Sequence, residues 1–203
     1  KIDEFSPKSK KIHIDIDPSS INKNVKVDLG LIGDVKVVLE KLVSVVKQKD
    51  PDFINSNKQK IAAWWSQIEN WRKKNSLGYV NSKDVIKPQY AVQRLYELTK
   101  AQDVFITTEV GQHQMWAAQH YKFDKPNRWM TSGGLGTMGY GLPAAVGVQV
   151  ANPDKLVIDI AGEASVLMTM QEMSTAVQYK LPIKIFILNN EYMGMVRQWQ
   201  ELL

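Results

Sequence analysis

Two nearly continuous apolar runs, each followed at once by small or polar residues, limit the folds open to this chain more than any other feature. They are KLVIDIAG (155–162) and IKIFILNN (183–190). A strand covered by helices on both faces has no polar side, so such runs are typical of buried strands in a parallel sheet. DVFITTE (103–109) is a third candidate strand. The three segments predict a parallel sheet in the last half of the chain.

Segments with helical spacing lie before and between these strands. Pro88 suits the first turn of a helix that runs through Ala91, Leu95 and Leu98, because a first-turn residue needs no N–H partner. RWMTS (128–132) is a poor candidate for a strand. The remaining helices are predicted at GQHQMWAAQHY (111–121), from near Gly139, at MQEMSTAVQY (170–179) and at MVRQWQ (195–200). This alternation predicts an α/β fold with an open parallel sheet flanked by helices.

The first part of the chain has its own strand and helix. KIHIDID (11–17) alternates as a strand does, and Pro18 closes it. Asp34 is a candidate N-cap for a helix with apolar residues at helical spacing. Residues 50–87 are polar and rich in lysine, with one helix expected from about Ile61 to Lys73. We interpret this stretch as a connection between two domains.

Composition limits the compartments and the kinds of partner that we expect for this chain. The 203 residues include no cysteine, which excludes disulfides and thiolate metal sites and is compatible with a reducing cytoplasm. No apolar run approaches the roughly 18–20 residues that span a bilayer. The net charge is +5, but Lys8, Lys10 and Lys11 form the only tight basic cluster. We therefore expect a cytoplasmic location, with neither nucleic acid nor a membrane as partner.

Polar loops follow each predicted strand, and in a parallel sheet they lie at one edge. One contains Glu163 and the next contains Asn190. A carboxylate and a carboxamide oxygen suit Mg²⁺. The small residues around Glu163 allow backbone N–H groups to approach a phosphate. These features describe a metal-bridged diphosphate site, although turn formation and strand-end capping explain the same residues equally well at this point.

A glycine pattern suggests a different ligand. Gly134, Gly136 and Gly139 spell G-x-G-x-x-G, and Asp159 follows twenty residues after the last glycine, as in a dinucleotide fingerprint. The segment before the glycines is a poor strand, however, and this interpretation gives the two oxygen donors no role. We therefore disfavour an NAD-dependent oxidoreductase.

Longer segments are more specific than these short patterns. They resemble the large, catalytic subunit of acetolactate synthase (acetohydroxyacid synthase), a thiamine-diphosphate-dependent family. The resemblance is dense from Gln89 to Leu203 and looser in HIDIDPSSINKN (13–24) and GDV (33–35). The segments that carry it are VGQHQMWAAQ (110–119), SGGLGTMGYGLPAAVG (132–147), QEMSTAVQY (171–179), LPIKIFILNN (181–190) and GMVRQWQ (194–200).

This resemblance implies a domain organisation. Residues 88–203 would form the pyrophosphate domain of the thiamine-diphosphate-binding fold, truncated at its C-terminus. Residues 1–49 would be the C-terminal end of a Rossmann-like, FAD-contacting middle domain, and residues 50–87 a linker. The family's essential glutamate belongs to an N-terminal domain outside these 203 residues. We therefore expect a piece of a larger protein, inactive in isolation.

The resemblance also implies roles for individual residues. None of them is a catalytic acid or base, and Met195 and Trp199 match the substrate channel. The metal ligands would be Glu163, Asn190 and Tyr192. The FAD contacts would be Asp15, Ile16, Asp34 and Val35. The thiamine diphosphate contacts would be Val110, Gly111, Gln112, His113, Gly136, Met138, Gly162, Ala164, Ser165 and Asn190.

One position departs from the family pattern. Glu163 stands where the family has Asp, and Ala164 where Gly is typical. The extra methylene moves the carboxylate by about one bond length, and Mg²⁺ requires near-octahedral geometry at about 2.0–2.1 Å. Either the backbone shifts to absorb the longer arm, or metal affinity is lower than in the family.

The activity implied is decarboxylation of pyruvate on thiamine diphosphate and carboligation to a second 2-keto acid, pyruvate or 2-ketobutyrate. This reaction belongs to the biosynthesis of valine, leucine and isoleucine. The family also implies Mg²⁺, FAD, a homodimer or tetramer of the catalytic subunit, and in some members a regulatory subunit. Pyruvate oxidase, pyruvate decarboxylase, another carboligase and a non-catalytic fragment are the alternatives.

Overall fold

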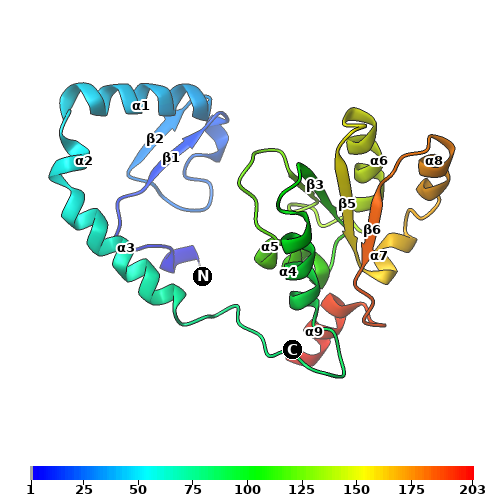
Figure 1. The fold of residues 1–203 in the computed structure, drawn as a ribbon. Coiled ribbons are helices and arrows are strands. Elements are labelled where there is room, and N and C mark those ends of the chain that lie inside the picture. Colours follow the sequence, from blue (N-terminus) through cyan, green and yellow to red (C-terminus); the bar gives the residue numbers. More distant parts are fainter. Residues whose placement is uncertain (1) are drawn as a thin grey trace. The chain divides into compact units, whose positions relative to one another are not determined.

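The computed structural model describes residues 2–203 and contains two compact units. The first ends at Ser76 and the second begins at Leu77. Figure 1 shows the helices and strands of each unit. No helix within residues 2–203 has both the length and the apolar character needed to cross a membrane.

The first unit is a two-stranded parallel sheet with helices. Strand β1 pairs with β2 so that Ile12 lies opposite Leu29. Asp34 caps the following helix as predicted: its carboxylate accepts hydrogen bonds from the backbone N–H groups of Lys36 at 2.9 Å and Val37 at 3.3 Å. The elements are η1 (Ile2–Glu4), β1 (Ile12–Asp15), η2 (Pro18–Ser20), β2 (Leu29–Ile32), α1 (Val35–Lys49), α2 (Phe53–Ser56) and α3 (Lys58–Arg72).

The second unit contains the sheet that the apolar runs predict. Its four strands run in the order β4-β3-β5-β6, and all the pairings are parallel. This confirms the prediction of an open, parallel α/β sheet. The elements are α4 (Pro88–Thr99), β3 (Val104–Thr108), α5 (Gln112–His120), β4 (Trp129–Thr131), α6 (Gly141–Ala151), β5 (Leu156–Ala161), α7 (Glu163–Leu167), α8 (Glu172–Gln178), β6 (Lys184–Ile187) and α9 (Gly194–Leu202).

The core of this unit lies on both faces of the sheet. Ile106, Ile158 and Ile160 pack with Val92 of α4 and Ala117 of α5 on one face. Alternate residues of the same strands pack on the opposite face against α6, in a cluster formed by Phe105, Ala145 and Val157. The side chains of a strand point alternately to its two faces, so β3 and β5 are buried on both faces and carry mostly apolar residues.

Four details of this second unit differ from the sequence-based expectations. RWMTS contains a strand after all, because the carbonyl of Arg128 accepts from the Ile106 N–H at 2.9 Å and starts a parallel pairing with β3. Strand β6 is not buried as predicted, since it is the last in the sheet order and its Lys184 and Ile187 are exposed. Leu98 is 67% exposed and does not join the core face of α4. The fourth difference is α7, a short helix where a loop was expected.

Candidate functional site

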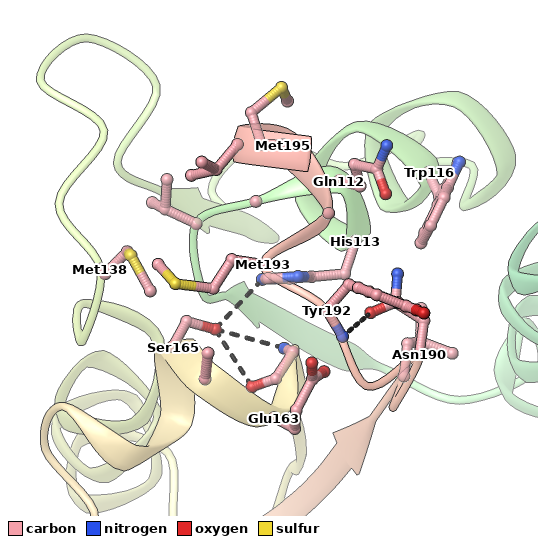
Figure 2. A pocket seen from close by; sticks show the side chains of 17 residues that line it. Gln112, His113, Trp116, Met138, Glu163, Ser165, Asn190, Tyr192, Met193 and Met195 are labelled. Carbon is pink, nitrogen blue, oxygen red and sulfur yellow. Dashed lines mark hydrogen bonds between the residues drawn. The ribbon is translucent and has the colours of Figure 1, made fainter. Parts of the chain in front are cut away.

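A pocket lies at the carboxyl ends of β3, β5 and β6, where the polar loops were predicted to converge. Its walls come from the loop after β3 and the start of α5, from α7, and from the segment between β6 and α9 (Figure 2). The lining residues are Val110, Gly111, Gln112, His113, Trp116, Met138, Gly162, Glu163, Ala164, Ser165, Leu188, Asn190, Tyr192, Met193, Gly194, Met195 and Val196.

His113 is held between two glycines at the centre of this pocket. A Cβ atom added to Gly111 would lie 2.7 Å from His113 Cε1, and one added to Gly162 would lie 2.7 Å from His113 Nδ1. Gly111 also has a φ of +154°. Any larger residue at either position would displace the imidazole. The two glycines therefore allow the loops after β3 and β5 to approach each other closely.

Burial makes His113 a neutral group at physiological pH. Desolvation lowers its pKa to about 4, and a hydrogen bond to the backbone of Glu109 opposes this only in part. Its Nε2 lies 3.5 Å from Ser165 Oγ. That hydroxyl also donates to the Gly162 carbonyl at 3.1 Å and accepts from the Gly162 N–H at 3.3 Å. The result is a fixed polar cluster without a positive charge.

The predicted oxygen donors lie on the same side of the pocket. Figure 2 shows the Glu163 carboxylate there with the side chain of Asn190. Asn190 Oδ1 accepts a hydrogen bond from the Tyr192 N–H at 3.2 Å, and Asn189 Oδ1 accepts from the Glu191 N–H at 2.9 Å. Glu191 has a φ of +61°. These bonds turn the chain sharply after β6, which leaves Asn190 and Tyr192 on the pocket lining.

A metal in this pocket would need amide and main-chain oxygens beside the carboxylate. Across residues 2–203, no three or more His, Cys, Asp or Glu residues lie close enough together to hold an ion by themselves. Glu163 would therefore supply the one negative charge, with neutral oxygens from Asn190 and Tyr192. Hard oxygen ligands of this kind fit Mg²⁺ better than a softer transition metal.

Helix α9 is tied to the pocket through a pair of glutamines. Gln112 Nε2 donates to Gln198 Oε1 at 2.9 Å. A Cβ atom on Gly194 would lie only 2.1 Å from Gln112 Oε1, so a larger residue there would displace the Gln112 side chain. This packing places Met193 and Met195 on the pocket wall. Sequence reasoning did not single out Gln198 or Met193, and the pairing of residues this far apart in the chain gives no local signal.

Among the residues predicted for thiamine diphosphate, the metal and the substrate channel, all but two line this one pocket. Gly136 lies in the exposed loop before α6, with a φ of +74°. Trp199 is 58% exposed on α9. The residues that do line the pocket are Val110, Gly111, Gln112, His113, Met138, Gly162, Glu163, Ala164, Ser165, Asn190, Tyr192 and Met195.

The predicted FAD contacts lie together in the first unit. Asp15 ends β1, and its carbonyl accepts a hydrogen bond from the Gly33 N–H at 2.9 Å. Asp34 and Val35, which follow Gly33, are the N-cap and first residue of α1. Ile16 follows β1 directly and is exposed. These four residues share the carboxyl edge of the two-stranded sheet, where nucleotides bind in α/β folds.

Two buried acids beneath the pocket were not predicted as functional. The Glu109 carboxylate accepts hydrogen bonds from the backbone N–H groups of Gly139 at 2.6 Å and Leu142 at 3.0 Å. Burial raises the Glu109 pKa, and these bonds oppose the increase. Asp159 accepts from Thr107 Oγ1 at 2.9 Å, but its Oδ2 has no partner. Burial, opposed by the Thr107 bond and reinforced by the Glu109 charge, raises the pKa of Asp159 to about 7.

Asp159 also settles the meaning of the glycine pattern. It lies inside β5 and is fully buried under α6. A carboxylate in that position cannot reach a ribose hydroxyl, so the dinucleotide interpretation has no acid to support it.

Comparison with known proteins places the chain in a family. Residues 109–203 match the C-terminal TPP binding domain of thiamine pyrophosphate enzymes, and residues 1–42 match their central domain. Thiamine pyrophosphate is another name for thiamine diphosphate.

Curated relatives match nearly the whole chain. The acetolactate synthase isozyme 3 large subunit of Escherichia coli is 46% identical over 200 residues, which cover 98% of this chain and 34% of the relative. The acetolactate synthase large subunit of Haemophilus influenzae is 44% identical over 202 residues, which cover 100% of this chain and 34% of the relative. Chloroplastic acetolactate synthase 1 of Nicotiana tabacum is 44% identical over 201 residues, which cover 99% of this chain and 29% of the relative. The chain spans about a third of the length of these relatives. It belongs to the thiamine pyrophosphate enzymes, and along nearly its whole length it is similar to acetolactate synthase large subunits.

Proposed function

We propose that this chain is the thiamine-diphosphate-binding part of an acetolactate synthase. The whole protein would decarboxylate pyruvate and join the remaining two-carbon unit to a second 2-keto acid, pyruvate or 2-ketobutyrate, in branched-chain amino acid biosynthesis. The observation that carries the proposal is the pocket in which Glu163, Asn190 and the small residues after β5 meet. The similarity to acetolactate synthase large subunits along nearly the whole chain supports it.

The residues of the pocket fit a diphosphate with Mg²⁺. Glu163, Asn190 and the Tyr192 carbonyl would hold the metal, with hard oxygens and one charge. The backbone N–H groups of Ala164 and Ser165 would donate to the diphosphate, because small side chains leave them accessible. The remaining contacts would come from Val110, Gly111, Gln112, His113, Gly136, Met138 and Gly162.

The protein's own contribution would be position and a dry pocket. Thiamine diphosphate, when bound, supplies the electron sink for decarboxylation. Trp116, Leu188 and Met193 give the pocket an apolar wall, which would shield a bound cofactor from water and strengthen its polar contacts. His113, neutral at physiological pH, would orient the diphosphate without adding charge.

We extend the proposal to the domains and to FAD. Residues 1–49 would complete a Rossmann-like domain that contacts FAD through Asp15, Ile16, Asp34 and Val35. Residues 50–87 would link it to the thiamine diphosphate domain of residues 88–203. The cluster of the four residues at one sheet edge supports this assignment. A homodimer or tetramer, an additional regulatory subunit and a cytoplasmic location complete the proposal. The absence of cysteine is compatible with that compartment.

The metal assignment is tested with Glu163→Gln in the complete protein. We expect this variant to lose Mg²⁺ and thiamine diphosphate affinity by about tenfold or more, because a neutral amide does not balance the metal's charge. Glu163→Asp restores the charge and should bind as tightly as the parent or more tightly. Titration with Mg²⁺ and thiamine diphosphate measures both affinities, and Glu40→Gln on the exposed surface of α1 is the control. Binding of Glu163→Gln equal to the parent would show that Glu163 is a solvated loop carboxylate.

Substrate choice is tested with Trp199→Leu. Trp199 follows Met195 by four residues in α9, so both lie on the same helix face and the ring extends the surface that begins at the pocket. We expect unchanged Mg²⁺ and thiamine diphosphate binding but a shift in the preference between pyruvate and 2-ketobutyrate of about tenfold, the effect of one methylene in an apolar site. Competition between the two keto acids measures it. An unchanged product ratio would remove Trp199 from the substrate channel.

A further inference from the structure

Helix α6 begins without a cap of its own. Its N-cap residue, Tyr140, makes no side-chain capping bond. Glu109, at the end of β3, performs this role from a distant part of the chain by accepting from the Gly139 and Leu142 N–H groups. A carboxylate at a helix N-terminus is stabilised both by the unpaired N–H groups and by the helix dipole. Glu109 is therefore a cap for α6 supplied by the neighbouring strand.

The same contact holds a loop that reaches the pocket. Residues 132–140, the glycine loop, connect β4 to α6 and carry Met138, which lines the pocket. Residues 133–137 of this loop are exposed. Gln114 anchors its start, donating to Thr131 Oγ1 at 2.7 Å and to the Ser132 carbonyl at 3.2 Å. At its far end, Met138 is next to Gly139, and the Gly139 N–H is bonded to Glu109.

Few other contacts could replace Glu109. Thr169 Oγ1 donates to the Gly139 carbonyl at 3.0 Å, but it cannot accept from the Gly139 and Leu142 N–H groups, whose acceptor is Glu109. Glu109 is fully buried. A buried carboxylate without hydrogen-bond partners would destabilise the folded protein. The Glu109 carboxylate therefore needs the two backbone N–H groups, and these N–H groups need the carboxylate as their acceptor. Glu109 also directly precedes Val110 and Gly111, which line the pocket.

We infer that Glu109 is a positioning residue for the thiamine diphosphate site: its carboxylate fixes the glycine loop and thereby the place of Met138 on the pocket wall. This inference rests on the proposed function, because it assigns Met138 to a cofactor pocket. It adds a residue that does not itself line the pocket.

The experiment compares three variants of the complete protein. Glu109→Gln keeps the size but puts an NH₂ group against backbone N–H donors, and Glu109→Asp keeps the charge on a shorter arm. Gln149→Leu is the matched control, since Gln149 is equally buried at the other end of α6, where its Nε2 donates to the carbonyls of Asn152 at 2.9 Å and Lys155 at 3.0 Å. Thermal stability, the dissociation constant of thiamine diphosphate and hydrogen exchange of the glycine loop are measured for each.

We expect Glu109→Gln and Gln149→Leu both to lower the melting temperature. Only Glu109→Gln should also weaken thiamine diphosphate binding, by about tenfold or more, and speed exchange of the loop amides. Glu109→Asp should recover part of the binding. Equal cofactor affinity in Glu109→Gln and the parent, or an equal loss in Gln149→Leu, would overturn the inference. If the parent itself binds no thiamine diphosphate, the proposed function fails. Unchanged hydrogen exchange of the glycine loop in Glu109→Gln would instead refute the role of Glu109 in fixing the loop.

Discussion

Replacing Gly141 by Ala is expected to destabilise the second unit by about 3 kcal/mol or more, at the upper end of the range for overpacking a core. An added Cβ would lie 2.3 Å from Asp159 Oδ1, 2.5 Å from the Glu109 nitrogen and 2.6 Å from the carbonyl carbon of Thr108. Two of these neighbours are backbone atoms of the central sheet, which cannot move aside. Denaturation by urea, followed by circular dichroism, measures the change in the free energy of unfolding.

The same helix offers a control with the opposite sign. Gly147 also lies in α6, but a Cβ there would have no heavy atom within 4 Å. Gly147→Ala should therefore stabilise the protein by up to about 1 kcal/mol, because glycine loses more backbone entropy than alanine in a helix. A Gly141→Ala variant as stable as Gly147→Ala would contradict the close packing of α6 on β3 and β5.

Asp159→Asn should change how stability depends on pH. The folded-state pKa of about 7 lies above the ordinary value of 3.8, so the folded chain binds this proton more tightly than the unfolded chain. The resulting stabilisation is fully present below about pH 4 and is lost as pH rises through about 7. A shift of this size corresponds to about 4 kcal/mol.

Asparagine has no proton to lose, so the folded variant does not have to bury a negative charge at high pH. We expect Asp159→Asn to be more stable than the parent at pH 8, by up to about 4 kcal/mol, with the difference disappearing towards pH 4. Thr107 can still donate to the asparagine oxygen. Asp154→Asn, at an exposed site, is the matched control for the substitution itself. Parallel pH profiles for the parent and Asp159→Asn would mean that Asp159 is ionised at no cost in the folded protein.

The parts of the fold that the sequence predicted correctly are those with a strong local pattern. The apolar run around Ile158 indicated a buried parallel strand, and Asp34 indicated the start of α1. The loops containing Glu163 and Asn190 were expected at one sheet edge because parallel strands end there. In each case neighbouring residues carry the information.

The parts that were missed depend on contacts between distant residues. Strand β4 has only three residues, and its pairing with β3 rather than its composition makes it a strand. Strand β6 has an apolar sequence but only one neighbouring strand within residues 2–203. Asp159 and Glu109 are charged types that usually face water. Their burial follows from the position of α6 above them, for which the sequence carries no local signal.

The three stretches that wall the pocket are far apart along the chain, and this sets an order of events during synthesis. Residues 110–116 and 162–165 leave the ribosome before residues 188–196, which complete the pocket. Strands β3 and β5 can pair while the third wall is still missing, because no residue of that wall takes part in their pairing. A ligand of the finished pocket cannot assist those early steps. Its binding free energy adds to the stability of the finished unit only after α9 has docked.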